Sequence, residues 1–430
     1  MWICCQIGAR EHYAVPRALH QQGMLAGLVT DWYAFGNQKS EILKTENLKA
    51  ERGNQKLFQR LNISACQLFG RRGRAALAAR AECIPDGLVR AFPFRSLLWK
   101  WSVRRLAAQK RSHEAYLQTD AAFASAVARL KLPPHDVFFG YSYASLEMLE
   151  AEKKRGVLTV LDQIDPGAVE FQLVAEEMAR FPELAGPPPE FPAAYYERNQ
   201  CEWTLADRIV VNSEWSRNAL VKQGVAPEKL VVVPLCYEAN AEKQKAESRD
   251  LHPSTFNPQL STTLLRVLFL GQVNVRKGIH YLMQAAKLLQ NEPVRFEVVG
   301  SIGILPGVVA SAPRNMRFHG PVSRNRAAQW YRQADVFVLP TLSDGFAITQ
   351  LEAMAHGLPV IVTPNCGRVV EDEKTGFIVP VRDPQALADA IFRFVRHPGL
   401  AREMAPTCRA AVKAYSVEAY GQRLVEIIRR

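Results

Sequence analysis

The stretch from Asp335 to Pro364 constrains the fold of this chain more than any other. Residues 335–339 form a short apolar run, which is typical of a strand covered on both faces in a parallel sheet. Apolar residues then recur with helical spacing between 351 and 358, and a second apolar run follows at 360–362. The pattern predicts a strand–loop–helix–strand unit of an α/β domain.

Two carboxylates stand out in this unit. Asp344 lies in the loop after the first strand, and Glu352 lies on the predicted helix, off its apolar stripe. Open parallel sheets bind ligands beyond the carboxyl ends of their strands. Asp344 and Glu352 are therefore our first candidates for a functional site.

The residues DGFAITQLEAMAHGLPVI, 344–361, resemble the acid-x7-Glu signature of the family-four retaining glycosyltransferases. Two further segments agree with that family in order and spacing: GQVNVRKG at 271–278 and ADRIVVNSEWSRNAL at 206–220. The resemblance extends from about Val160 to the C-terminus. It implies an α/β, GT-B architecture, in which two Rossmann-like parallel-sheet domains face a cleft and the C-terminal helix crosses back to the N-terminal domain.

The length and the linker composition agree with two domains. A chain of 430 residues is too long for one ordinary core. Residues 238–263 are polar and show no apolar period, so they are predicted to be the interdomain linker. We expect an N-terminal acceptor domain at 1–237 with the terminal helix 414–430, and a C-terminal nucleotide-sugar domain at 264–413.

The loop at 271–278 carries a basic pair, Arg276 and Lys277, at the head of a predicted helix, which suits a diphosphate. The resemblance implies that Lys277 binds the diphosphate of the sugar donor. It also implies that Glu352 accepts hydrogen bonds from the ribose hydroxyls and that Asp344 accepts hydrogen bonds from the sugar hydroxyls. The family usually has arginine where Gln272 stands and glutamate where Asp344 stands, and Arg276 is our candidate for the missing charge. The predicted catalytic set is Lys277, Arg276, Asp344 and Glu352, and the predicted donor-binding set adds Gly271, Gln272, Gly300, Gly345, Phe346, Ala347 and Ile348.

The N-terminal domain offers weaker signals. An apolar run at 2–7 leads into a turn with Gly8 and Arg10, and either a phosphate approaches this turn or it is an ordinary strand–helix connection. The resemblance also implies a histidine near the end of the strand at 157–161. Gln163 and Asp165 stand there instead, and we take them as candidates for the cleft.

The formal charge of +12 lies in one segment. Residues 52–111 hold fourteen Lys and Arg and two acidic residues, interleaved with Phe, Leu and Trp. This pattern suits an interfacial element on an anionic membrane surface, or a solvated basic face packed on the domain. No nucleic-acid motif accompanies it, so nucleic acid is not an expected partner.

The remaining features concern location and cofactors. Eight scattered cysteines, a start without a signal-peptide pattern and no apolar window of membrane-spanning length favour a cytoplasmic protein, peripheral on the inner face of the membrane if segment 52–111 binds lipid. No Asp-x-Asp dyad occurs, so we expect no metal and no cofactor.

The predicted function is transfer of a sugar from a nucleotide-diphosphate sugar to a sugar or lipid-linked acceptor with retention of configuration, in surface polysaccharide or glycolipid synthesis. Two alternatives stay open. One is a GT-B epimerase or phosphorylase. The other is a catalytically degenerate nucleotide-sugar-binding protein, which the departures at Gln272 and Asp344 would suit.

Overall fold

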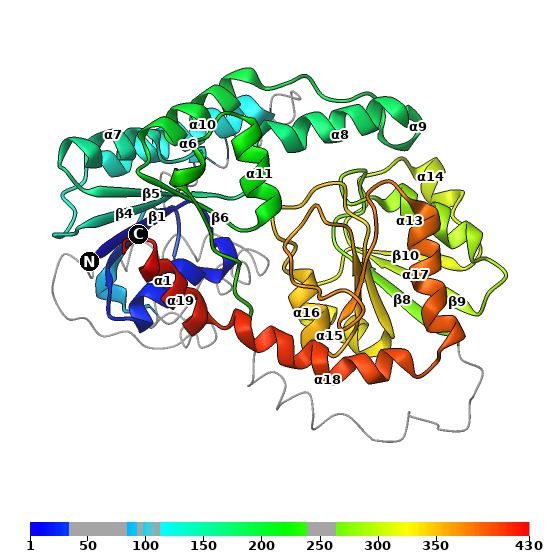
Figure 1. Ribbon diagram of the computed structural model, residues 1–430. Coiled ribbons are helices and arrows are strands. Elements are labelled where there is room, and N and C mark those ends of the chain that lie inside the picture. The colour runs from blue at the N-terminus through cyan, green and yellow to red at the C-terminus, as the bar shows by residue number, and fades with distance from the viewer. Residues whose placement is uncertain are drawn as a thin grey trace, which may run out of the picture.

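The computed structural model describes residues 1–33, 84–92, 98–99, 101, 103, 105, 112–238 and 264–429. The described chain forms two parallel sheets, each covered by helices on both faces (Figure 1). The predicted α/β class with two parallel-sheet domains is confirmed. Of the predicted linker 238–263, only Glu238 lies among the described residues.

The N-terminal domain is built on a sheet of seven strands in the order β3-β2-β1-β4-β5-β6-β7. Its strands are β1 Trp2–Gln6, β2 Leu25–Thr30, β3 Val89–Ala91, β4 Val137–Tyr141, β5 Leu158–Gln163, β6 Arg208–Val211 and β7 Leu230–Val232. Its helices are α1 Ala14–Gln21, α6 Ser112–Ala128, α7 Leu146–Lys154, α8 Ala168–Arg180, α9 Pro182–Ala185, α10 Ala193–Leu205 and α11 Glu214–Lys222, with short 3₁₀ turns at Arg10–His12, Asp86–Leu88 and Pro227–Lys229.

The C-terminal domain is built on a sheet of six strands in the order β10-β9-β8-β11-β12-β13. Its strands are β8 Leu265–Leu270, β9 Val294–Val299, β10 Met316–Gly320, β11 Val336–Leu339, β12 Val360–Val362 and β13 Gly376–Ile378. Its helices are α13 Ile279–Leu288, α14 Pro306–Ala310, α15 Arg324–Gln333, α16 Thr349–Ala355, α17 Pro384–Arg396 and α18 Leu400–Val412, followed by a 3₁₀ turn at Lys413–Tyr415 and by α19 Val417–Glu426.

The strand order of the C-terminal sheet reverses between β8 and β11, which pair directly. At such a switch point the loops after the two central strands diverge and leave a ligand crevice at their carboxyl ends. Here those loops are residues 271–278 after β8 and 340–348 after β11, which are the two segments with the predicted site residues. The N-terminal sheet reverses in the same way between β1 and β4.

The C-terminal helix returns to the N-terminal domain, as predicted (Figure 1). Ser416 caps α19 by accepting a hydrogen bond from the Ala419 N–H at 3.2 Å, and the buried face of the helix joins the core around β1 and α1. A side chain at Gly421 would lie 3.1 Å from the Ala18 carbonyl oxygen, so glycine lets α19 approach α1 closely.

The predicted elements differ from the observed ones mainly at their ends. The strand expected at 157–161 continues to Gln163, and that difference places Gln163 inside the sheet. Among the described residues, no helix is long and apolar enough to cross a membrane.

Candidate active site

Backbone contacts join the two switch-point loops of the C-terminal domain. The Leu342 N–H and the Thr341 hydroxyl both donate to the Arg276 carbonyl oxygen, at 2.8 and 3.1 Å. Gly278 has a φ of +69°, and a Cβ there would lie 1.8 Å from the Pro340 carbonyl oxygen. Only glycine permits this left-handed conformation beside the neighbouring loop, so the basic pair is fixed against the loop after β11.

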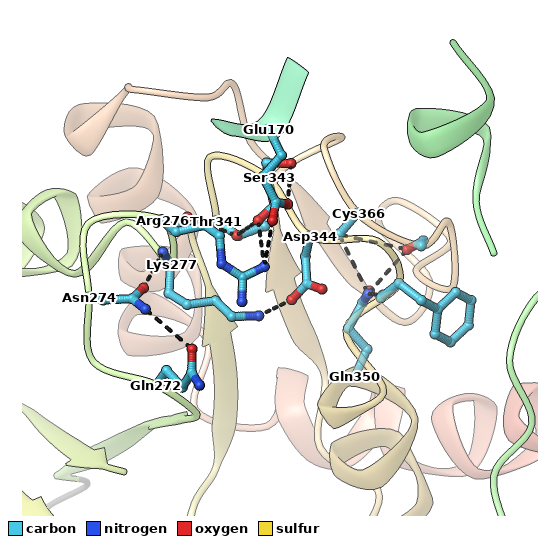
Figure 2. A network of polar contacts seen from close by, with 12 residues as sticks. Glu170, Gln272, Asn274, Arg276, Lys277, Thr341, Ser343, Asp344, Gln350 and Cys366 are labelled. Atoms are coloured by element: carbon cyan, nitrogen blue, oxygen red, sulfur yellow. Dashed lines mark hydrogen bonds and ion pairs between the residues drawn. The ribbon is translucent and has the colours of Figure 1, made fainter. Parts of the chain in front are cut away.

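Lys277 and Asp344 form an ion pair across these loops (Figure 2). Both side chains are largely buried, with 12% and 13% of their surface exposed. Burial and, to a smaller extent, the positive charge of Arg276 together lower the pKa of Lys277 to about 7, although the negative charge of Glu170 opposes the shift. Lys277 therefore gains or loses its positive charge near neutral pH.

Arg276 faces a carboxylate of the other domain. Its Nη1 donates to Glu170 Oε1 and to the Ser343 carbonyl oxygen, each at 3.4 Å. The Ser343 hydroxyl donates to Glu170 Oε2 at 2.7 Å and accepts from Trp215 Nε1 at 2.9 Å. Burial raises the pKa of Glu170. The contacts of Glu170, at the start of α8, and of Trp215, on α11, hold the two domains together at the site.

Sequence reasoning missed Glu170. Its one local signal is its place in the first turn of α8, directly after the segment that follows β5. Such a place favours any acidic residue through the helix dipole, and therefore does not by itself indicate a ligand site. A second interdomain approach lies next to it, where a Cβ at Gly345 would be 2.8 Å from the Ile164 carbonyl oxygen.

Glu352 lies apart from the Lys277–Asp344 pair. Its Oε2 accepts a hydrogen bond from the hydroxyl of Tyr331 at 2.8 Å, and no other side-chain bond of Glu352 is formed among the described residues. Tyr331 comes from α15 and is 2% exposed, and the ring of His356 stacks on it at 5.2 Å. His356 Nδ1 contacts the Glu352 backbone carbonyl at 2.8 Å, so this histidine bonds the backbone.

The other predicted donor-binding residues lie in the loops after β8, β9 and β11. Gly300 has a φ of +145°, and a Cβ there would lie 1.6 Å from the Gly271 carbonyl oxygen, so the loops after β8 and β9 touch at two glycines. The exposed Gln272 side chain accepts from Asn274 Nδ2 at 3.3 Å. Gln350 donates to the Phe346 carbonyl oxygen at 2.8 Å and fixes the loop before α16 (Figure 2). In that loop, Phe346 and Ala347 are buried, Ala347 has a φ of +64°, and Ile348 precedes α16.

The N-terminal candidates are held by their own domain. The Gly8 N–H donates to Asp31 Oδ1 at 2.8 Å. Arg10 lies over the Tyr141 ring, with 5.6 Å between its Cζ and the ring centroid, and its buried Nε forms no hydrogen bond in the described structure.

Gln163 and Asp165 form a connected pair. Gln163 is fully buried, accepts from Trp203 Nε1 at 2.8 Å and donates to Asp165 Oδ1 at 3.0 Å. That same oxygen accepts from the Tyr143 hydroxyl at 2.9 Å. Asp165 is partly exposed, whereas both ends of the Gln163 amide are used inside the domain.

Only part of the basic segment 52–111 is described, namely 84–92, 98–99, 101, 103 and 105. Within that part, Leu98 and Trp101 are exposed and Arg105 lies over the Trp101 ring, while Trp99 packs against Phe123. No group of three or more His, Cys, Asp or Glu among the described residues is placed to hold a metal ion.

Known proteins resemble this chain in sequence and in fold. Residues 265–397 match the family model of the glycosyl transferases group 1. The chain is 31% identical over 172 residues to the D-inositol 3-phosphate glycosyltransferase of Xylanimonas cellulosilytica, covering 37% of this chain and 41% of that protein. It is 30% identical over 242 residues to the enzyme of the same name from Streptosporangium roseum, covering 52% and 55%. The matches thus span about half the length of these curated relatives.

Solved structures share the whole fold. A sucrose-phosphate synthase from Thermosynechococcus elongatus superposes with a TM-score of 0.58 at 18% identity, covering 100% of this chain and 98% of that one. Anabaena HepE in complex with UDP superposes with a TM-score of 0.55 at 14% identity, covering 100% and 99%. At these identities the likeness shows the fold, which is GT-B. The match of residues 265–397 to the glycosyl transferases group 1 model confirms the resemblance to the family-four glycosyltransferases.

Proposed function

We propose that this protein transfers a sugar from a nucleotide-diphosphate sugar to an acceptor. The observation that carries the proposal is the pair of cations, Lys277 and Arg276, which the two switch-point loops hold at the carboxyl end of the C-terminal sheet. Relatives named as glycosyltransferases and a fold neighbour in complex with UDP-glucose support this substrate class.

The chemistry requires such cations. When the bond between the anomeric carbon and the diphosphate breaks, positive charge develops on the sugar ring and negative charge on the departing phosphate. Preorganised positive groups in a water-poor site stabilise that phosphate. Lys277 and Arg276 would supply two charges without a metal ion, and the amides around Gly345, Phe346 and Ala347 are further candidates.

The carboxylates have binding roles in this proposal. When the diphosphate binds the ammonium group of Lys277, Asp344 would lose its ion pair. Asp344 would then accept hydrogen bonds from the hydroxyl groups of the sugar. Glu352, which accepts a hydrogen bond from the Tyr331 hydroxyl, would also accept hydrogen bonds from the ribose hydroxyls. Retention of configuration follows if the departing phosphate itself deprotonates the acceptor on the same face of the sugar.

The acceptor would bind on the N-terminal side of the cleft. The exposed Leu98 and Trp101 of the basic segment favour a lipid-linked or membrane-proximal acceptor, as in surface polysaccharide or glycolipid synthesis. Absence of binding to anionic vesicles at low salt would remove that part of the proposal.

A second candidate function is nucleotide-sugar binding without turnover. The departures from the usual family residues at Gln272 and Asp344 favour it. In this structure Lys277 pairs with Asp344 and Arg276 pairs with Glu170. Binding of a nucleotide sugar therefore has to break both pairs.

The test is a panel of nucleotide sugars in the presence of a chelator, with thermal shift and release of nucleoside diphosphate as readouts. Wild type is compared with Lys277→Ala and Glu352→Ala. Turnover of one nucleotide sugar by wild type, lost in both variants, supports the transferase, and the anomeric configuration of its product tests retention. Binding without turnover supports the second candidate, and no binding at all contradicts both.

A further inference from the structure

The C-terminal domain has a cavity of about 260 Å³ between strands β8, β9 and β10 and helix α15. Strands β8, β9 and β10 contribute one arginine each to its lining: Arg266, Arg295 and Arg317. Arg266 lies on β8, five positions before Gly271, the first residue of the loop that follows this strand. Five positions correspond to about 16 Å along a strand. The cavity therefore lies toward the opposite end of the strands from the Lys277–Asp344 pair.

The sheet register brings like charges together in this cavity. Arg266 and Arg295 are direct partners on the neighbouring parallel strands β8 and β9. Like charges opposite each other destabilise a sheet. Arg317 comes from the adjoining edge strand β10, where it is the register partner of Glu297.

The protein supplies little negative charge to offset these arginines. Glu297 is the one carboxylate among the described lining residues, and its Oε2 already contacts His319 Nε2 at 2.5 Å. Arg266 donates to the Gln333 carbonyl oxygen at 3.5 Å, and Asp335, outside the lining, accepts from its backbone N–H. Arg295 and Arg317 form no ion pair or side-chain hydrogen bond with any other residue of the described structure.

Three guanidinium groups therefore share this concave surface, where Arg266 and Arg317 are exposed and Arg295 is partly buried, and Glu297 is the one carboxylate in the described lining. A guanidinium group binds phosphate oxygens through two parallel N–H donors. The volume is slightly below that of pockets for drug-sized ligands, which begin near about 300 Å³, and suits a phosphate group with a small organic body. Trp330, whose ring lies 4.3 Å from that of His319, gives the cavity a flat wall for that body.

We propose that this cavity is a second binding site, separate from the sugar-donor cleft, for a phosphate-bearing anion. A soluble phosphate ester and the headgroup of an anionic lipid share this chemistry. The site requires only that the ligand carry phosphate oxygens to Arg295 and Arg317.

The first arm of the test uses inorganic phosphate and isothermal calorimetry. All proteins carry Lys277→Ala, so that the donor loop contributes little to the heat. We compare this parent with Arg295→Gln/Arg317→Gln and with a charge-matched control, Arg326→Gln/Arg396→Gln, in which both arginines are exposed and lie outside the cavity. Loss of two charge-assisted contacts should weaken phosphate binding about a hundredfold in the first double variant and leave the control unchanged.

The second arm uses phosphatidylcholine vesicles with and without phosphatidic acid, in a sedimentation assay on the same three proteins. A lipid headgroup is identified as the ligand by two results together. Binding depends on phosphatidic acid and is lost only in Arg295→Gln/Arg317→Gln, and inorganic phosphate gives no heat of binding. Equal weakening in both double variants shows a nonspecific charge effect and overturns the proposal. Equal behaviour of all three proteins toward both probes overturns it as well. Thermal unfolding of each variant verifies that the domain is folded.

Discussion

Arg276 and Glu170 lie on different domains, 106 positions apart in sequence, and their side chains meet at 3.4 Å beside the Lys277–Asp344 pair. Glu170 Oε2 also accepts a hydrogen bond from the Ser343 hydroxyl, which helps to hold the carboxylate in place. Glu170 thus lies against Arg276, a cation that the proposed reaction requires for the diphosphate. An anionic ligand that takes Arg276 must displace Glu170 first.

We therefore expect Glu170→Gln to bind a nucleotide sugar more tightly than wild type. Glutamine keeps an oxygen that can accept from Ser343 but removes the negative charge from Arg276. The pair is partly exposed, at 27% and 17%, so the gain should be modest, about threefold to tenfold. Calorimetric titration measures it.

The matched control is Glu176→Gln, on the same helix, whose carboxylate pairs with Arg382. Its affinity should equal that of wild type. Unchanged or weaker binding by Glu170→Gln would show that Glu170 does not compete with the ligand.

The affinity for a nucleotide sugar should fall as pH rises through about 7. The pKa of Lys277 is near 7 in the free protein, so the lysine is protonated below that pH and loses its charge above it. A bound diphosphate raises this pKa, and binding therefore takes up a proton. By linkage, the affinity is highest below pH 7 and falls by up to about tenfold per pH unit above it.

Lys277→Arg separates this effect from other titrations, because arginine stays charged throughout the range. Its affinity should be nearly independent of pH between 6 and 9. Parallel pH profiles for wild type and Lys277→Arg would assign the dependence to another group.

Gly278→Ala should destabilise the C-terminal domain strongly. The residue has a φ of +69°, and a Cβ would collide with the Pro340 carbonyl oxygen at 1.8 Å. We expect a loss of about 3 kcal/mol or more in the free energy of unfolding, together with loss of nucleotide-sugar binding.

Gly23→Ala is the control for backbone strain alone, since Gly23 has a φ of +67° and nothing within 4 Å of the added Cβ. It should lose only about 1 kcal/mol. Urea unfolding of both variants checks the difference, and equal losses would mean that the contact with Pro340 does not matter.

Tyr331→Phe should impair the use of the sugar donor more than it impairs folding. The variant removes the hydroxyl that holds Glu352 Oε2 at 2.8 Å. We expect the free energy of unfolding to fall by about 1 kcal/mol. A positioning role further predicts a KM for the nucleotide sugar several-fold higher, with a nearly unchanged kcat. A loss of stability with no change in KM would make this bond purely structural.

Much of the architecture could be predicted from the sequence because strand and helix patterns are local. The apolar run at 335–339 and the helical spacing after it predicted β11 and α16. Element ends were less certain, and β5 extends through Gln163, because a strand ends where its neighbours stop pairing with it.

The sequence by itself determined which residue types lie at the carboxyl ends of the strands, since these follow directly from the order of apolar runs and loops. Only the tertiary structure decided which of them meet. Lys277 contacts Asp344 because β8 pairs with β11, Tyr331 reaches Glu352 because α15 lies beside α16, and Glu170 reaches Arg276 across two domains. Arg266 faces Arg295 because the register of two strands aligns them. Such contacts depend on pairing between distant segments, and no local pattern encodes that pairing.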